Sequence, residues 1–314
     1  MTALSAQYRK QHMQKKLVFG LGQTGMSCVR FLVRQGYEVA VFDTRANPPL
    51  IEDLYRDFPN VEVTLEKVSR ELFENVDQVV LSPGISMRSD ALKYAREKEI
   101  EIVGDIELFA LSANAPIIAV TGSNGKTTTT TLISEIFRAA DLKIETGGNI
   151  GTPVLDMLAL PQPDFYVLEL SSFQLETTKS LRPAVAVLLN ISADHMDRYD
   201  DLDDYAMSKL SIVEGALQTV INLDDQWLSD HLSSVDNYVG FREKMPAENE
   251  FGLLPVEESE KDGQLWIAQG SRKICNTASM KLQGRHQMLN AVAAAAVAHL
   301  CDVDDSVLCK VGRF

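Results

Sequence analysis

Residues 121–128, TGSNGKTT, combine glycine, lysine and threonine at a spacing that could bind phosphate. Glycines let the backbone curl so that consecutive N–H groups point at phosphate oxygens, and a following helix adds the positive end of its dipole. Lys126 would supply a point charge and Thr127 a hydroxyl for Mg²⁺. The predicted nucleotide contacts of this phosphate loop are Gly122, Ser123, Asn124, Gly125, Lys126, Thr127 and Thr128.

This loop departs from the general G-x-x-x-x-G-K-[ST] pattern, which would place glycine where the chain has Val120. A chance glycine turn before a helix is the alternative interpretation of so short a pattern. The apolar run Ile117–Val120 before the loop and the threonine-rich, proline-free run Thr127–Phe137 after it are typical of a strand and a helix. This context favours phosphate binding.

A second glycine loop lies near the N-terminus, where residues 20–25 read GLGQTG. It follows a short apolar strand, Lys16–Phe19, and opens a helix that we expect to continue to Gln35. The next strand, Glu38–Phe42, ends at Asp43, where an acid can bind a ribose hydroxyl. Alone, this unit favours NAD, although the same geometry serves any ligand that presents a diphosphate to a helix N-terminus.

Further strands are predicted over residues 61–65, 78–81 and 100–103, with a helix over residues 89–98. In an open parallel sheet, ligands bind beyond the carboxyl ends of the strands. Polar residues that follow these strands would share that rim and contact a ligand, or they serve only as turn residues. The rim residues are Gln23, Thr24, Asp43, Thr44, Arg45, Ser82 and Gly84.

Two polar clusters follow apolar strands in the second half of the chain. Residues 164–168 form a predicted strand that ends at Glu169, and the strand predicted over residues 184–190 leads to Asp194 and His195. An acid in the place of Glu169, near a phosphate loop, organises Mg²⁺ in nucleotide hydrolases, whereas the alternative is a surface acid at a strand end. Histidine is a good metal or phosphate partner, although a single histidine is more often structural.

A helical period of 3.6 residues over residues 202–218 gathers apolar side chains on one face, and Lys209 lies near the middle of that face. One interpretation is that its stem packs there while the ammonium reaches water. The other is that burial lowers the pKa of Lys209 and frees an amine for chemistry or modification. The pattern leaves both interpretations open.

The rest of the chain shows less distinctive patterns. Residues 144–151 are expected to form a glycine-rich loop, because they lack strand length. Strands are indicated at residues 220–223, 238–241 and 265–268, and helices at residues 284–300 and 305–310.

The composition indicates a soluble protein of two domains. The chain has 314 residues, of which 45% are hydrophobic, and this is enough for a sizeable core. Its net charge of −14 argues against a broad basic face for nucleic acid. Four scattered cysteines lack metal-ligand spacing. The polar residues 1–16 lack a signal-peptide core and no segment is apolar enough for a membrane span, so we expect a cytoplasmic protein.

Taken together, these motifs resemble the Mur ligase family along nearly the whole chain. The short loop TGSNGKT is similar to the family form, which accounts for Val120. The other matching segments are residues 20–25, 43–45, 82–85, 104–109, 147–151, 169–176 (ELSSFQLE), 194–199 (DHMDRY), Lys209 and residues 284–290.

The resemblance implies an α/β fold of two domains. Residues 1–103 would form an N-terminal Rossmann-like parallel-sheet domain that holds a UDP-linked substrate, and residues 104–310 a central P-loop ATPase domain. A third, amino-acid-binding domain of the family is expected to be absent from this chain.

The resemblance also implies roles for individual residues. The rim residues of the first domain would surround uridine and diphosphate, and ATP with Mg²⁺ would bind in the second domain. Thr127 and Glu169 would hold one Mg²⁺, and His195 with Lys209, which is carbamylated in this family, a second. The implied catalytic residues are Lys126, Glu169, His195 and Lys209. Asn149, Ser171, Asp194 and His195 would contact substrate, and Asn290 the adenine side of ATP.

The implied reaction joins D-glutamate to UDP-N-acetylmuramoyl-L-alanine, a cytoplasmic step of peptidoglycan synthesis. The L-alanyl carboxylate attacks the γ-phosphate of ATP to give an acyl phosphate, and the D-glutamate amine then displaces phosphate. Mg²⁺ and Lys126 would offset charge, so catalysis is mostly positioning and electrostatics. Because the third domain is expected to be absent, we expect the chain to bind the UDP substrate without turnover. We also expect a monomer with no nucleic-acid or membrane partner.

Three alternatives stay open. Another carboxylate–amine ligase of the superfamily, such as a folylpolyglutamate synthase, would share the second domain, but the complete G-x-G-x-x-G unit favours a UDP-linked substrate. An NAD-dependent oxidoreductase would use residues 20–43 and would leave Glu169 and His195 unexplained. A regulatory nucleotide-binding module would carry the same loops without ligase chemistry.

Overall fold

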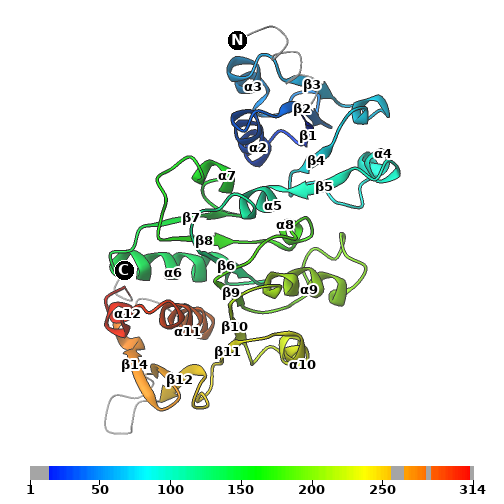
Figure 1. Ribbon diagram of the computed structural model, residues 1–314. Coiled ribbons are helices and arrows are strands. Elements are labelled where there is room, and N and C mark those ends of the chain that lie inside the picture. Colours follow the sequence, from blue (N-terminus) through cyan, green and yellow to red (C-terminus); the bar gives the residue numbers. More distant parts are fainter. Residues whose placement is uncertain (1–13, 256–264, 281–283, 312–314) are drawn as a thin grey trace. The chain divides into compact units, whose positions relative to one another are not determined.

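The computed structural model describes residues 14–255, 265–280 and 284–311, and it divides into two compact units (Figure 1). Of the described residues, 14–112, 153–160 and 176–180 form the first unit, and the others form the second. This division differs from the single boundary predicted after residue 103, because two later segments pack with the first unit. The polar stretch noted before residue 14 lies outside the described residues.

The sheet of the first unit is parallel throughout, with the strand order β3-β2-β1-β4-β5. The chain adds β2 and β3 on one side of β1 and then returns to its other side with β4, so the switch point of the sheet lies between β1 and β4. The strands are β1 (Lys15–Phe19), β2 (Glu38–Asp43), β3 (Glu62–Leu65), β4 (Gln78–Leu81) and β5 (Glu101–Gly104). The helices are α2 (Gln23–Arg34), α3 (Ile51–Asp57), α4 (Lys93–Glu97), α5 (Asp105–Ala110) and α7 (Val154–Met157).

Apolar runs explain the buried strands of this sheet. Leu17 and Phe19 of β1 are fully buried, which is typical of a parallel sheet whose faces are covered by helices. The ring of Phe19 lies 4.5 Å from that of Phe42, measured between centroids, and both belong to one core cluster with Phe73. This packing fixes the carboxyl ends of β1 and β2, which the glycine loop and Asp43 follow.

The second unit contains a sheet of nine strands in the order β14-β13-β12-β11-β10-β9-β6-β8-β7. β12, β13 and β14 pair antiparallel, and the other neighbours pair parallel. β6 lies between β8 and β9, so the exits of these three strands share one edge. The strands are β6 (Ile117–Thr121), β7 (Ile144–Gly148), β8 (Phe165–Glu169), β9 (Val185–Leu188), β10 (Gln218–Asn222), β11 (Tyr238–Phe241), β12 (Phe251–Pro255), β13 (Leu265–Gln269) and β14 (Arg272–Asn276).

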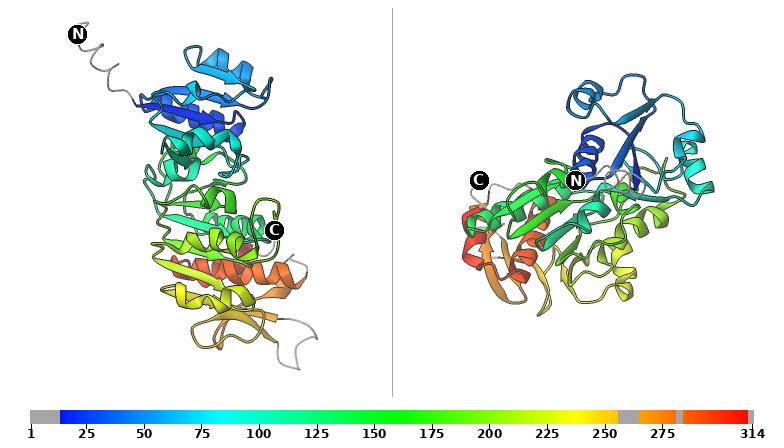
Figure 2. Two further views of the ribbon diagram at one scale, coloured as in Figure 1. Left: turned by 90° about the vertical axis from the view of Figure 1, so that its right-hand side faces the viewer. Right: turned by 45° about the horizontal axis from the view of Figure 1, so that its top comes forward.

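Helices α6 and α11 pack against each other, and α11 also contacts β9 to β13 (Figure 2). Residues 291–298 of α11, six of them alanine, are buried, and their small side chains let the helix approach the sheet closely. The core also includes Ile133 and Phe137 of α6, so this helix, which begins at the phosphate loop, is fixed to the sheet. The helices are α6 (Lys126–Ala139), α8 (Ser172–Leu175), α9 (Leu202–Leu210), α10 (Gln226–Asp230), α11 (Arg285–Leu300) and α12 (Asp305–Val311). Short 3₁₀ helices occupy residues 71–73, 90–92, 211–213, 232–234 and 277–279.

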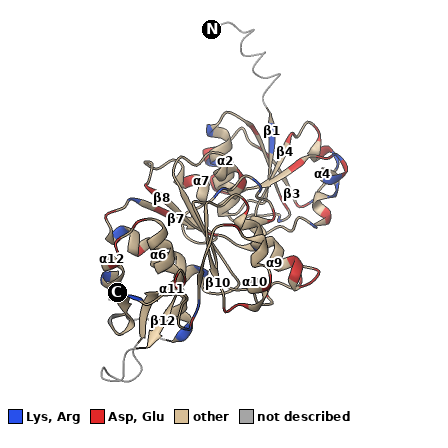
Figure 3. Cartoon of the chain, turned by 60° about the horizontal axis from the view of Figure 1, so that its bottom comes forward, with Lys and Arg blue, Asp and Glu red and all other residues tan. Residues whose placement is uncertain are grey.

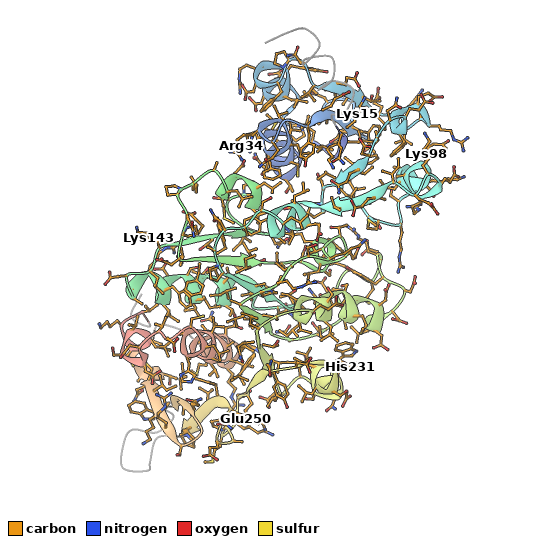
Figure 4. The ribbon with its side chains drawn as sticks, viewed as in Figure 1. Lys15, Arg34, Lys98, Lys143, His231 and Glu250 are labelled. Carbon is orange, nitrogen blue, oxygen red and sulfur yellow. The ribbon has the colours of Figure 1, made fainter. Side chains whose placement is uncertain are left out.

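The structure corrects the sequence predictions at two places in the second unit. Residues 144–151, predicted as a loop, contain β7, which pairs with β8. The amide of Lys143, labelled in Figure 4, donates to Asp164 at 2.7 Å where this pair begins. The helix predicted from the period over residues 202–218 ends at Leu210, and Gly215 then turns the chain with a φ of 70° that a helix does not allow. Strands β12 and β14 were not predicted.

Two further observations concern the described residues. Among them, no helix is long and apolar enough to cross a lipid bilayer. Figure 3 shows that, over the described part of the chain, Lys and Arg are dispersed at separated places on both units, with Asp and Glu between them.

Candidate functional site

The phosphate loop joins β6 to α6, and Gly125 is its sharpest turn. Gly125 has a φ of 83°, in the left-handed region that favours glycine, and a Cβ placed on it would lie 2.5 Å from the side-chain oxygen of Asn290. α6 begins directly after it at Lys126, and the amides of a first helical turn have no carbonyl partner within the helix. The N–H groups of residues 125–128 and the positive end of the α6 dipole can therefore bind an anion.

The first half of the loop has a different arrangement. The amide of Ser123 donates to the Asn190 carbonyl oxygen at 2.9 Å, and the amide of Asn124 donates to the Asn190 side-chain oxygen at 2.8 Å. Contact of Ser123 and Asn124 with a nucleotide stays a prediction, and the structure shows that it would not use these two amides as they now bond. Their amides are already engaged by the loop that follows β9.

Two lysine side chains bond to carbonyl oxygens of the phosphate loop, one from the loop itself and one from the buried face of α9. The ammonium of Lys126 donates to the carbonyl oxygens of Gly122 and Ser123 at 2.8 and 3.0 Å, and that of Lys209 donates to Gly122 at 3.0 Å. Burial, and then the charge of Lys126, lower the pKa of Lys209 to about 7, against the smaller opposing effects of Asp194 and Glu169. Only 2% of Lys209 is exposed, so its ammonium does not reach water.

Glu169 at the end of β8 is buried beside the phosphate loop, because β8 pairs with β6 and places Glu169 opposite Val120. Its two carboxylate oxygens each accept a hydrogen bond of 2.8 Å, one from the hydroxyl of Thr127 and one from the side-chain amide of Asn149. The amide of Asn149 also donates to the Glu169 carbonyl oxygen at 2.8 Å. The alternative of a surface acid at a strand end is therefore excluded.

The loop after β9 carries Asp194 and His195 at the protein surface. Their side chains are about half exposed and lie 3.6 Å apart, and His195 has a left-handed φ of 54°. The His195 ring packs against the Phe173 ring, with centroids 4.8 Å apart. The guanidinium of Arg198 lies 3.6 Å from the centroid of the Phe173 ring. The structure thus places His195 beside Phe173 and Lys209 beside Gly122, and their joint binding of a second metal ion stays a prediction.

Ser171 takes part in a local turn before α8. Its amide and hydroxyl donate to the side-chain oxygen of Gln174 at 3.1 and 3.3 Å, and its hydroxyl accepts from the Gln174 amide. These bonds belong to the helix start and occupy the polar atoms predicted to contact substrate.

In the first unit, Asp43 receives four donors. Its carboxylate accepts the amides of Leu21 and Arg45 at 2.7 and 2.9 Å, and the Nε and a terminal nitrogen of the Arg45 guanidinium at 2.8 and 2.7 Å. Burial raises its pKa, but the bonds from Arg45 and the two amides outweigh burial and lower the pKa to about 2. A carboxylate has about four acceptor positions, so Asp43 would have to release a donor to bind a ribose hydroxyl.

The other rim residues surround the switch point between β1 and β4. The Ser82 hydroxyl donates to the Gly20 carbonyl oxygen at 3.1 Å. A Cβ on Gly25 would lie 1.8 Å from the same oxygen, so only glycine lets α2 approach this loop. Gln23, Thr44, Arg45 and Gly84 are exposed, and Thr24 and Ser82 are half-buried.

Sequence reasoning missed three side chains that shape the second site, namely Asn190, Phe173 and Tyr205. Tyr205 lies one helical turn before Lys209 on α9, its hydroxyl is 3.0 Å from that of Ser123, and its ring is 4.8 Å from the Lys209 ammonium. The i, i+4 spacing was an available signal for Tyr205. Asn190 is the first polar residue after an apolar strand. This position predicts that Asn190 lies at the edge of the sheet, but it does not predict its hydrogen-bond partners.

Comparisons with known proteins match both parts of the chain. A family model for the Mur ligase middle domain matches residues 120–298, and one for the Mur ligase MurD-like N-terminal domain matches residues 14–104. The UDP-N-acetylmuramoylalanine--D-glutamate ligases of Pseudomonas aeruginosa and Marinobacter nauticus are 44% and 41% identical over 284 and 300 residues. These alignments cover 90% and 96% of this chain but 62% and 66% of the relatives, so the chain spans less than two thirds of their length.

Solved structures show the same fold. The UDP-N-acetylmuramate:L-alanyl-gamma-D-glutamyl-meso-diaminopimelate ligase of Neisseria meningitides aligns over 96% of this chain and 98% of its own, with a TM-score of 0.64 and 20% identity. The UDP-N-acetylmuramate-alanine ligase of Thermotoga maritima aligns over 96% and 68%, with a TM-score of 0.57 and 19% identity. The predicted α/β fold is confirmed. The model for the middle domain alone matches more than half of the residues of this chain, and the chain therefore belongs to the Mur ligase family.

Proposed function

We propose that this chain carries the UDP-substrate and ATP sites of a cytoplasmic ligase that joins D-glutamate to UDP-N-acetylmuramoyl-L-alanine in peptidoglycan synthesis. The observation that carries the proposal is the gathering of Lys126, Lys209 and the Thr127–Glu169 pair at one phosphate loop. A carboxylate that must meet a triphosphate needs cations and a metal ion between them. The names of the relatives at 41% and 44% identity support this choice of substrates.

The proposed reaction has two steps. An oxygen of the L-alanyl carboxylate attacks the γ-phosphorus of ATP, the bond to the β–γ bridging oxygen breaks, and ADP leaves. The D-glutamate nitrogen then attacks the acyl carbon and loses a proton, and phosphate leaves as the amide forms. Lys126 and the amides of residues 125–128 would hold the phosphates in line. The Lys126 charge and the amide hydrogen bonds would stabilise the charge that moves toward the leaving oxygen in the transition state.

Thr127 and Glu169 fit a Mg²⁺ ion that binds together with the nucleotide. A buried carboxylate beside a hydroxyl provides two hard oxygen ligands, and the Glu169 carboxylate accepts from Thr127 and Asn149. Among the described residues, no group of three or more His, Cys, Asp or Glu side chains could hold a metal ion. This agrees with Mg²⁺, which usually keeps several waters and takes few protein ligands.

Lys209 would supply a further ligand after reaction with CO₂. A pKa of about 7 leaves much of the amine neutral at neutral pH. Its nitrogen can attack the carbon of CO₂ and lose one proton to solvent, which gives a carbamate with one N–H and a carboxylate. The remaining N–H can keep the bond to Gly122, and His195 on the loop after β9 would be the other ligand of a second Mg²⁺.

The structure weighs against the two enzyme alternatives. An NAD-dependent oxidoreductase would need Asp43 for a ribose hydroxyl, and all four acceptor positions of this carboxylate are in use. A folylpolyglutamate synthase would not require the N-terminal unit, which matches a MurD-like domain model over residues 14–104.

The proposal is tested by calorimetric titration of the 314-residue chain with UDP-N-acetylmuramoyl-L-alanine. We expect saturable binding that Arg45→Ala weakens about tenfold or more, because a guanidinium bond to a diphosphate is charge-assisted. Arg56→Ala is the matched control, since Arg56 is also exposed and its partners are the carboxylates of Asp53 and Asp57. Wild-type protein that does not bind this substrate would overturn the proposal.

A further inference from the structure

Asn190 is joined to the phosphate loop by three hydrogen bonds. Its side-chain oxygen accepts from the Asn124 amide at 2.8 Å, its side-chain nitrogen donates to the Asn124 carbonyl oxygen at 3.0 Å, and its own carbonyl oxygen accepts from the Ser123 amide at 2.9 Å. The first two bonds form a reciprocal pair that needs a donor and an acceptor in one short side chain. Aspartate could supply only the acceptor, and alanine neither.

A second set of bonds runs beside this pair. The Ser192 amide donates to the Ser123 hydroxyl oxygen at 2.9 Å, and the Ser123 hydroxyl lies 2.9 Å from the Ser192 carbonyl oxygen. The side-chain amide of Asn124 donates to the Ser192 hydroxyl at 3.3 Å. Asn190 and Ser192 are therefore both bonded to Ser123 and Asn124, through side chains and backbone.

The residues on either side of Asn190 are held from the opposite direction. The side chain of Asn222, at the end of β10, donates to the Leu189 carbonyl oxygen at 2.8 Å. The carboxylate of Asp225 accepts the Ile191 amide at 2.8 Å. Asn190 thus projects from a fixed piece of backbone and presents its amide to the phosphate loop in one orientation.

We propose that Asn190 is the positioning residue that presets the first half of the phosphate loop for nucleotide and transmits nucleotide binding to the loop carrying Asp194 and His195. The inference rests on the proposed nucleotide site. With the amides of Ser123 and Asn124 held by Asn190, the chain reaches Gly125 in the orientation that exposes the next amides to phosphate. Any shift that phosphate causes at Asn124 passes through the reciprocal pair into residues 190–195, which lie on the same segment.

The test compares Asn190→Asp and Asn190→Ala with Asn249→Asp. Asn249 is exposed in a turn, so its variant adds the same charge as Asn190→Asp away from the site. Binding of the non-hydrolysable ATP analogue AMPPCP with Mg²⁺ is measured by calorimetry, and the His195 imidazole is followed by NMR of histidine-labelled protein. Circular dichroism establishes whether each variant is folded. If Asn190→Ala is not folded, Ser192→Ala, which removes one hydroxyl, replaces it in the comparison.

We expect wild-type protein and Asn249→Asp to bind the analogue within twofold of each other and to show the same change of the His195 signal. Both Asn190 variants should bind about tenfold more weakly, since each breaks at least one bond that orders the loop. At saturating analogue, the His195 change should be smaller in these variants, which a general loss of stability would not produce. Ser192→Ala should lie between the two groups.

The outcomes separate this inference from the proposed function. Wild-type protein that does not bind the analogue would contradict the nucleotide site itself. Normal binding by wild-type protein, together with unchanged affinity or an unchanged His195 response in the Asn190 variants, would overturn the role of Asn190 alone.

Discussion

Lys126 and Lys209 donate to the same acceptor, the carbonyl oxygen of Gly122, at 2.8 and 3.0 Å. Burial lowers the pKa of both lysines, and the charge of Lys126 lowers that of Lys209 further. Two cations that share one carbonyl oxygen repel each other, and an anion bound at the loop would relieve this repulsion. The arrangement ties the protonation of Lys209 to the occupancy of the phosphate loop.

The first prediction concerns the pH dependence of stability in Lys209→Met. The pKa of Lys209 is lowered to about 7 from 10.5, so between these values the unfolded chain binds more protons and the wild-type protein gains stability as pH rises. A methionine lacks this dependence. We therefore compare the free energy of unfolding of the variant minus that of wild type, measured by urea unfolding. This difference should be about 3 kcal/mol greater at pH 7 than at pH 10. Parallel curves for the two proteins would contradict the buried, uncharged state, and exposed Lys67→Met is the control.

The second prediction concerns Asp43→Asn at low pH. The pKa of Asp43 is lowered from 3.8 to about 2, so its stabilisation is present above pH 3.8 and is lost as pH falls toward 2. At pH 6 the variant should be about 2 kcal/mol less stable than wild type, and this difference should shrink between pH 4 and pH 2. Thermal unfolding at several pH values measures it. Asp236→Asn, at an exposed site, should show no such window.

The third prediction concerns Mg²⁺ and Glu169→Gln. The substitution keeps the size of the side chain and an acceptor for Thr127, but removes the charge that would hold Mg²⁺. Titration with ADP should show that Mg²⁺ increases affinity in wild-type protein and has little effect in the variant. Glu214→Gln, on an exposed residue, should keep the Mg²⁺ effect. An equal effect of Mg²⁺ in Glu169→Gln would exclude Glu169 as the ligand.

The fourth prediction compares two glycine substitutions in thermal unfolding. Gly125→Ala meets both a left-handed φ of 83° and the Asn290 side chain 2.5 Å from the new Cβ, so it should destabilise the protein by about 1–3 kcal/mol. Gly84→Ala has no atom within 4 Å of the new Cβ, so its effect should be within about 0.5 kcal/mol of wild type. Similar losses in both variants would mean that the turn at Gly125 is not under steric control.

Much of the fold and the location of both loops could be predicted because these features are local in sequence. Apolar runs mark β1, β6 and β8, and glycine marks the turns that follow β1 and β6. β7 escaped prediction for a physical reason. A Cβ on Gly148 would lie 2.2 Å from the Glu169 carbonyl oxygen, so close pairing with β8 requires glycine, and glycine removes the side-chain pattern that identifies a strand.

The pairing of polar groups in the site was less predictable, because the partners are distant in sequence. The place of Asp43 at a strand end predicts a ligand contact, but it does not reveal that the carboxylate accepts bonds from Leu21 and Arg45. The loop pattern predicts nucleotide contacts at Ser123 and Asn124, but it does not reveal that their amides bond to Asn190. For Lys209, the helical period predicts a place on the apolar face of a helix, and only the fold shows that the side chain is buried.

The sequence separation of the bonds at the phosphate loop also has a consequence for how the protein folds. The hydrogen bond between Thr127 and Glu169 joins residues 42 positions apart, and the bond between Gly122 and Lys209 joins residues 87 positions apart. Loops of this length close late in folding, because the entropy lost on closing the loop opposes the contact until the contact has formed. A chain emerging from the ribosome has its glycine–lysine–threonine loop long before it has α9, so the capacity to hold a nucleotide should appear as one of the last events of folding.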